Sequence, residues 1–435
     1  MMKFFRKIHL WLSVPFGIFI TLICFSGAML IFEPEITRAV KSEVYTVAPA
    51  GRMPLPMDEL MEGVKATLPD SVSITGVTVF ADSDRAYQVS LSKPRRASVY
   101  VNQYTGEVTG KYERLGFFST MFKLHRWLLD SANPHGEGVK VGKTLVGIST
   151  IIFVIALITG VVIWWPRARK VLRHSLSISF SHGWKGFWKG LHVAGGMYAL
   201  IFVLAMALTG LTYSFGWYRT AFYAVCGVEH TPRNFGQSAP KTAAVEEKGG
   251  RGQRGEGRPE GRGERGERGE GRPEGRGQRG EGNWHGEGHG DGEHRRGERG
   301  ERGGHRRSEF GRWQQVYDAL KAQNPGAPQI TVGPETASVT LGTTGNGRAA
   351  NRYEFNRRSG EITPTALYAD ANGADKLRGW IYAIHTGTLG GWVTRILWLL
   401  GALLGATLPL TGYYIWIRHL TKKKDHHHDH HHAHA

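Results

Sequence analysis

Cysteine is nearly absent from this chain, with two residues, Cys24 and Cys226, among 435. Cys24 lies inside an apolar run and Cys226 lies outside one, so no disulfide framework is available. Aspartate and glutamate are missing from the four long apolar runs of the sequence. Their absence excludes metal sites built from carboxylates inside those runs.

The four apolar runs are each about 20 residues long, which is the length that a helix needs to cross a bilayer core. They predict membrane-spanning helices within the ranges 1–33, 143–165, 188–213 and 391–417. A cleaved signal peptide is the alternative for the first run. The length of that run, its poor cleavage site and its likeness to the third run favour a retained anchor.

Basic residues flank the predicted helices on one side of the membrane. They precede the first helix, fill the loop at 166–187 and its borders, and follow the fourth helix: Lys3, Arg6, Lys7, Arg167, Arg169, Lys170, Arg173, Lys185, Lys189, Arg418, Lys422, Lys423 and Lys424. This excess predicts that both termini lie in the cytoplasm. Because the formal charge of +18 comes largely from these residues and from one outer tract, it does not indicate nucleic-acid binding.

A histidine and a Ser/Thr-Gly pair recur at a fixed interval in two of the runs. Gly27 follows His9 by 18 residues, and Gly210 follows His192 by 18. A helix rises about 27 Å over that interval, so each histidine and its glycine lie near opposite faces of a membrane core of about 30 Å. The other two runs end on Thr159-Gly160 and Thr411-Gly412.

Two more histidines, His125 and His385, stand before the other two runs, in membrane-proximal segments at 117–142 and 377–390. Lys143 and Arg395 each precede the closing glycine of their run by 17 residues. The chain therefore reads as an internal duplication of a histidine helix, an outer domain, a histidine segment and a second helix. An insertion after His125 makes His135 the reserve candidate there.

Two outer regions follow the first and third predicted helices. Residues 34–116 and 308–376 each predict a helix followed by strands rich in β-branched and aromatic residues, with turns at 104–107 and 359–361. A connector at 214–248 precedes the second region. Two small α+β modules of one kind are the simplest interpretation.

Residues 249–307 contain almost no apolar residue and abundant glycine, arginine and glutamate. Such a segment cannot bury enough surface to fold, so we expect a disordered outer loop. Histidines that could bind metals occur in this tract and in the tail at 418–435: His285, His289, His294, His305, His426, His427, His428, His430, His431, His432 and His434. An expression tag and a native metal-binding segment explain the tail equally well.

The four histidines His9, His125, His192 and His385 form two pairs by depth in the membrane. His9 and His192 lie near the cytoplasmic side, and His125 and His385 lie near the outer side. Two imidazoles leave a tetrahedral zinc site incomplete, whereas they complete a haem iron whose other four ligands come from the porphyrin. Because the motif Cys-x-x-Cys-His is absent, the usual covalent attachment is excluded. The sequence predicts two non-covalent haems in an all-α four-helix membrane core.

Cations near each pair are candidates for binding haem propionates. They are Arg6 and Lys189 on the inner side, and Arg126, Lys143 and Arg395 on the outer side. Ordinary interfacial placement is the alternative for each of them. Glycines that would let a flat macrocycle approach are Gly17, Gly195, Gly196, Gly390 and Gly391.

Several segments of the chain resemble one family. They are IHLWLSVPFG, LHRWLL, GLHVAGG, IHTGTLGGW, the Ser/Thr-Gly helix endings, the WWP sequence at 164–166 and the module ends YTGEV and RSGEI. Together they resemble the PepSY-associated transmembrane proteins, which include di-haem siderophore reductases of the bacterial inner membrane. The resemblance implies a four-helix core with two b-type haems and two periplasmic PepSY-like modules. Relatives sometimes carry a cytoplasmic flavin and nicotinamide domain. No motif for such a domain occurs here, so the electron donor is not identified.

The haem sites and the resemblance together favour an oxidoreductase that carries electrons to a ferric siderophore or another ferric chelate in the periplasm. Aromatic and cationic residues of the outer side would hold the chelate, for example Tyr100, Tyr104, Arg126, Tyr353 and Arg378. A PepSY-type regulatory or peptidase-inhibiting protein and a quinone-linked respiratory haem protein are the alternatives. A metal transporter ranks last, because the runs contain no broken helix of the expected kind.

Overall fold

The computed structural model describes residues 1–49, 51–94, 96–130, 141–180, 183–229, 308–342 and 345–432, with side chains up to Thr421. The tract at 249–307 with its histidines, and the reserve candidate His135, lie outside the described residues. The tail continues the last helix as far as His432, and the side chains of its histidines also lie outside the description.

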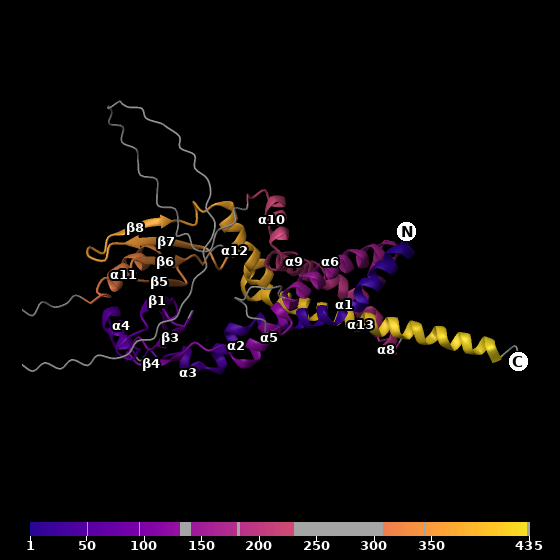
Figure 1. Cartoon of the computed structure of the whole chain (residues 1–435), viewed down its shortest axis with the longest axis horizontal. Coiled ribbons are helices and arrows are strands. Elements are labelled where there is room, and N and C mark those ends of the chain that lie inside the picture. The colour runs from indigo at the N-terminus through magenta and orange to yellow at the C-terminus, as the bar shows by residue number, and fades with distance from the viewer. Residues whose placement is uncertain are drawn as a thin grey trace, which may run out of the picture. The chain divides into compact units, whose positions relative to one another are not determined.

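Four helices are long and apolar enough to cross a membrane, as the sequence predicts. They are α1 (Met2–Leu30), α6 (Val141–Ala168), the continuous run of α8 (Gly183–Gly190), η1 (Leu191–Gly195) and α9 (Gly196–Ser214), and α13 (Gly391–His432) (Figure 1). Both α1 and α9 pack against α6 and α13. Ile20, Phe153, Val203 and Leu408 bring one buried side chain from each helix into a common core.

Short helices flank this bundle. α5 (Gly116–Trp127) packs on α1 and α6, and α12 (Gly373–Thr386) packs on α9. The remaining short elements are α2 (Glu33–Val40), α3 (Ser42–Tyr45), α7 (Leu172–Ser175), α10 (Gly216–Val225) and the 3-10 turn η2 (Thr388–Gly390). With 12 and 14 residues, α5 and α12 are too short to span a bilayer.

Eight strands form one antiparallel sheet in the order β4-β3-β2-β1-β5-β6-β7-β8 (Figure 1). Their bounds are β1 (Ile74–Phe80), β2 (Tyr87–Leu91), β3 (Ser98–Val101), β4 (Val108–Lys111), β5 (Gln329–Val332), β6 (Thr336–Thr340), β7 (Ala350–Phe355) and β8 (Ile362–Ala366). Two helices, α4 (Met57–Ala66) and α11 (Trp313–Gln323), bury their apolar sides in one core with the strands.

The elements that the sequence predicts for each outer module are present, but the modules are not separate. β1 of the first module pairs with β5 of the second, with Val77 opposite Val332 and Thr78 opposite Thr331. The strand order runs outward from this junction in the same way on both sides. Pairing at the junction satisfies the backbone groups of what would otherwise be two exposed sheet edges.

Candidate metal centres

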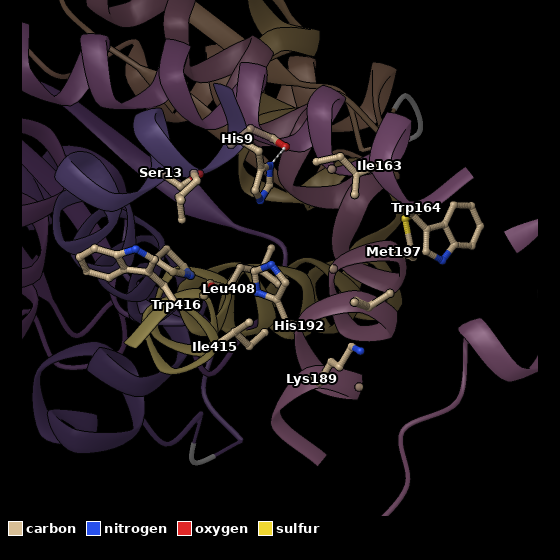
Figure 2. A pocket seen from close by; sticks show the side chains of 18 of the residues that line it. His9, Ser13, Ile163, Trp164, Lys189, His192, Met197, Leu408, Ile415 and Trp416 are labelled. Carbon is tan, nitrogen blue, oxygen red and sulfur yellow. Dashed lines mark hydrogen bonds between the residues drawn. The ribbon is translucent and has the colours of Figure 1, made fainter. Parts of the chain in front are cut away.

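The first histidine pair joins α1 to η1. The rings of His9 and His192 have centroids 6.3 Å apart and planes inclined at 84°. His192 lies on a π-helical turn between α8 and α9, and such turns redirect side chains and occur frequently at functional sites. Figure 2 shows both imidazoles facing the same cavity.

The second pair joins the two short helices, α5 and α12. The rings of His125 and His385 have centroids 6.1 Å apart and planes inclined at 46°. Each histidine lies in the last turn of its helix, and each helix ends on a residue in the left-handed conformation, Leu128 at φ 50° and Gly387 at φ 73°. The structure therefore brings together the same two pairs that the sequence predicts from depth in the membrane.

The two rings of the first pair are each hydrogen-bonded to another helix. Nδ1 of His9 lies 3.0 Å from the carbonyl oxygen of Ala156 and 3.0 Å from Oγ1 of Thr159. Nδ1 of His192 lies 3.1 Å from the carbonyl oxygen of Leu408 and 2.9 Å from Oγ1 of Thr411. Because a carbonyl oxygen can only accept, Nδ1 carries the proton in both rings, and Nε2 keeps a free lone pair.

The second pair repeats this arrangement. Nδ1 of His125 lies 2.9 Å from the carbonyl oxygen of Ile23, and Nδ1 of His385 lies 2.9 Å from that of Met206. Oγ1 of Thr209 is 3.3 Å from Nδ1 of His385. Burial lowers the pKa of His385 to about 4, helped by the nearby His125 and opposed by the bond to Met206. Burial also lowers the pKa of His125, so burial favours the neutral form of both rings.

The Ser/Thr-Gly pairs are the docking places of the four rings. In each case the accepting carbonyl lies three residues before the Ser or Thr, which are Ser26, Thr159, Thr209 and Thr411. The glycine that follows each Ser or Thr lies against the ring. A Cβ added at the glycine would come close to the ring atom Cε1 in all four cases: 2.8 Å for Gly27 and His125, 3.0 Å for Gly210 and His385, 3.4 Å for Gly412 and His192, and 3.5 Å for Gly160 and His9. The repeated Ser/Thr-Gly pairs are visible in the sequence, but the ring that each glycine contacts depends on which helices are neighbours.

A cavity of about 1320 Å³ surrounds the first pair (Figure 2). It reaches from buried side chains such as Phe153 and Leu408 to exposed cations, which include the predicted Arg6 and Lys189. Among the described lining residues there is no aspartate or glutamate. Of the glycines expected to face a macrocycle, Gly196 lines this cavity, whereas Gly17 packs against Tyr413 and Pro409 of α13.

The three outer cations occupy different settings. Arg395 donates to Glu35 through two nitrogens at 2.6 Å each and also to the carbonyl oxygen of Ile31. Arg126 is exposed and lies over the rings of Phe122 and Trp127, at 5.3 and 5.2 Å. Lys143 is half-buried in the first turn of α6. Arg395 is therefore engaged in an ion pair between α13 and α2.

Three tyrosines proposed for chelate binding are buried, which corrects that expectation. Tyr100 and Tyr104 pack with Tyr45 in a small core, and the Tyr104 hydroxyl donates to the carbonyl oxygen of Ser83 at 2.9 Å. Tyr353 lies in the main core of the sheet. Tyr100 and Tyr353 are strand residues whose side chains point into a core rather than to solvent, and Tyr104 lies in the turn that follows β3. Arg378 is exposed, with Asp375 at 3.6 Å.

Within the described residues, no group of three or more histidine, cysteine, aspartate or glutamate side chains is placed to hold a metal ion. In the described part of the chain, each histidine pair thus offers two imidazoles without a third side chain of these four types. In comparisons with known proteins, a family model described as the PepSY-associated TM region matches residues 6–419, nearly the whole chain. No curated protein matches the chain.

Proposed function

Because the chain belongs to the PepSY-associated TM family, and because both histidine pairs lie within the matched region, we propose that it is a transmembrane electron-transfer protein. It holds two b-type haems and reduces ferric chelates. The observation that carries this proposal is the geometry of the two pairs, including the free Nε2 that the Nδ1 hydrogen bonds leave on each ring.

The ring separations fit one iron between the two histidines of each pair. A histidine nitrogen binds a metal at about 2.0 Å, and a five-membered ring with bonds of about 1.33 Å has its atoms about 1.1 Å from its centre. Two rings that would both bind one iron therefore have centroids at most about 6.2 Å apart. The observed separations are 6.3 and 6.1 Å.

The surrounding residues have the chemistry that a haem requires. His9 and His192 would hold the iron of the first haem, and His125 and His385 that of the second. The carbonyls bonded to Nδ1 hold the tautomer and orient each ring. Arg6 and Lys189 at the first cavity would bind propionates. When bound, the haem supplies one-electron transfer.

The two sites lie toward opposite ends of α1. His9 is near the start of this helix, and Gly27, which contacts His125, is near its end. The 18 residues between them rise about 27 Å, close to the thickness of a membrane core. The basic residues beside the first site indicate that this site faces the cytoplasm. Electrons therefore enter at the first site and leave at the second. The two helices of the second site directly follow the sheet in the chain: α5 comes after β4, and α12 comes after β8. We therefore assign the sheet to the same side of the membrane as the second site, the periplasm.

Haem content and ligand substitution test the cofactor. The full-length protein should contain two haems that acidified acetone extracts. His9→Ala or His192→Ala should remove the first, and His125→Ala or His385→Ala the second. His174→Ala is the matched control, because His174 lines the first cavity outside the pair. A content near one or zero, or the same surviving site after His9→Ala and His385→Ala, would contradict the proposal.

Reoxidation kinetics test the substrate. The reduced protein should be reoxidised anaerobically by ferric siderophores while a chelator traps ferrous iron in equal amount. Reduction weakens the hold of hard oxygen ligands on iron, so the metal is released. Haem that stays reduced with every ferric complex but is reoxidised readily by a quinone would reassign the protein to respiratory electron transfer.

A further inference from the structure

A tryptophan of another helix holds the end of α12, where His385 lies. The indole Nε1 of Trp398, in α13, donates to the carbonyl oxygen of Ile384 at 2.6 Å. Ile384 is the residue directly before His385. The last carbonyls of a helix have no partner within that helix, so Trp398 satisfies a backbone group that α12 itself cannot satisfy.

The ring of the same tryptophan holds the turn that follows. Gly387 ends α12 in the left-handed conformation, at φ 73°. A Cβ added at Gly387 would lie 2.6 Å from Cγ of Trp398, so the indole packs directly against the backbone of this turn. Thr394, one turn earlier on α13, donates to the carbonyl oxygen of Gly387 at 2.6 Å. α13 therefore holds the end of α12 on both sides of His385.

α9 connects this contact to the imidazole itself. Phe202 of α9 packs on Trp398, with ring centroids 5.2 Å apart and planes inclined at 71°. Met206 lies four residues later, on the same face of α9, and its carbonyl oxygen accepts from Nδ1 of His385. The ring of His385 and the backbone beside it are thus held by two helices that contact each other at Phe202 and Trp398.

The first half of the chain has a valine at the corresponding position. Lys143 and Arg395 each precede their closing glycine by 17 residues, which aligns the two halves. Trp398 follows Arg395 by three residues, and Val146 follows Lys143 by three. Valine has neither a donor nor a flat ring, so the two halves hold His125 and His385 differently.

We propose that Trp398 is a positioning residue of the second metal site, because it fixes the backbone from which His385 reaches the iron. This inference rests on the proposed function. Trp398 acts through His385 and is assigned no contact with the haem. Loss of an outer contact that orients a ligand typically lowers metal affinity about 10–100-fold.

The first test replaces Trp398 by Phe, which keeps a ring and removes the donor. The matched control is Trp392→Phe on the same helix, where the indole is exposed and stacks on Phe32. Both variants are made in the His9→Ala protein, so that only the second haem contributes to the spectra. We expect Trp398→Phe to weaken haem binding about 10-fold or more.

Two further readouts distinguish positioning from general support of the fold. The EPR signal and the midpoint potential of the second haem should change in Trp398→Phe, because both depend on how the iron is ligated. Trp392→Phe should leave affinity, signal and potential unchanged. A Trp398→Phe protein that only unfolds at a lower temperature, with the second haem unaltered, would overturn the proposal.

The first haem provides an internal comparison. In the His125→Ala protein, which keeps the first haem, Trp398→Phe should change neither haem affinity nor potential. Equal effects on the two haems would mean that the substitution loosens the whole bundle, and the proposal would fail.

Hydrogen exchange in haem-free protein separates this inference from the proposed function. Residues 384–390 should exchange faster in Trp398→Phe than in Trp392→Phe, since the lost bond lets the end of α12 open locally. Faster exchange in a protein that never binds haem would retain the hold of Trp398 on His385 and reject the proposed function. Equal exchange in the two variants would overturn the role of Trp398.

Discussion

At the scale of single residues, the four histidines share one mode of anchoring. Each ring donates through Nδ1 to a carbonyl of another helix and rests on a glycine of that helix. Such outer contacts orient a ligand before any metal arrives and raise its basicity. The geometry of each pair is thus set by two docking places on neighbouring helices, and not by the histidine side chains alone.

Substituting alanine for the docking glycines should have unequal effects. At Gly27 a new Cβ would lie 2.8 Å from Cε1 of His125, whereas at Gly160 it would lie 3.5 Å from that of His9, an ordinary contact. Gly27→Ala should therefore displace His125 and lower haem affinity at the second site about 10–100-fold. Gly160→Ala is the matched control. Haem titration of the two variants checks this, and equal behaviour would contradict the docking role of Gly27.

The histidine pairs were predictable because the rise of a helix per residue gives the position of each residue along the membrane normal. Only histidines at the same depth in the membrane can come into contact. The docking of each ring was not predictable, because it depends on which helices are neighbours. The three tyrosines were placed wrongly for a related reason. Alternation along a strand identifies two faces, but the elements that cover each face decide what is buried. Tyr353 lies in the core that α4 and α11 cover, whereas Tyr100 and Tyr104 lie in the small core with Tyr45 of α3.

At the scale of elements, the eight-residue helix α2 connects the bundle to the sheet. Glu33 accepts from Arg114, which precedes α5, at 2.5 and 2.9 Å. Glu35 accepts from Arg395 at the start of α13, at 2.6 Å from each of two nitrogens. Bidentate pairs of this kind fix orientation as well as distance. α2 therefore ties together the segments next to the second histidine pair.

The Glu35 pair should make stability depend on pH. Burial alone would raise the pKa of Glu35, but the hydrogen bonds from Arg395 and the charges of Arg395 and Arg38 outweigh it and hold the pKa below its ordinary value. A lowered pKa contributes stability that is present above the unfolded pKa of about 4.3 and is lost as pH falls through the folded value.

Glu35→Gln should accordingly destabilise the protein at pH 7 by about 1–3 kcal/mol. The difference from the unmodified protein should shrink as the pH falls to about 4 and below. Thermal unfolding in detergent across this range is the measurement, and Glu43→Gln, at an exposed position of α3, is the control. A destabilisation that does not change with pH would show that the charge of Glu35 is not what holds α13.

At the scale of the whole molecule, the junction of β1 and β5 makes one sheet from two distant parts of the chain. The hydroxyls of Thr78 and Thr331 lie 2.8 Å apart across this junction, and the two residues are directly opposite in register. Sequence patterns predict strands within each module, but nothing in them specifies which two edges pair, because the same alternation suits an edge strand and a central strand.

A cysteine pair tests the junction. With Cys24 and Cys226 replaced by alanine, Thr78→Cys together with Thr331→Cys should form a disulfide within one chain, because side chains that face each other across an antiparallel pair are close enough. Thr78→Cys with Ser338→Cys is the control, since Ser338 lies on the next strand, β6. Non-reducing electrophoresis distinguishes the products. Cross-links between chains would mean that the sheets join between molecules.

The same junction has a consequence for synthesis. β1 ends at Phe80, and β5 begins at Gln329, 249 residues later. At about 5–20 residues per second, the ribosome needs between about 10 and 50 s to make the intervening chain. During that time the first four strands can assemble, but the open edge of β1 has no native partner and can pair with any other extended chain. The nascent protein is therefore most exposed to aggregation before its second half is made.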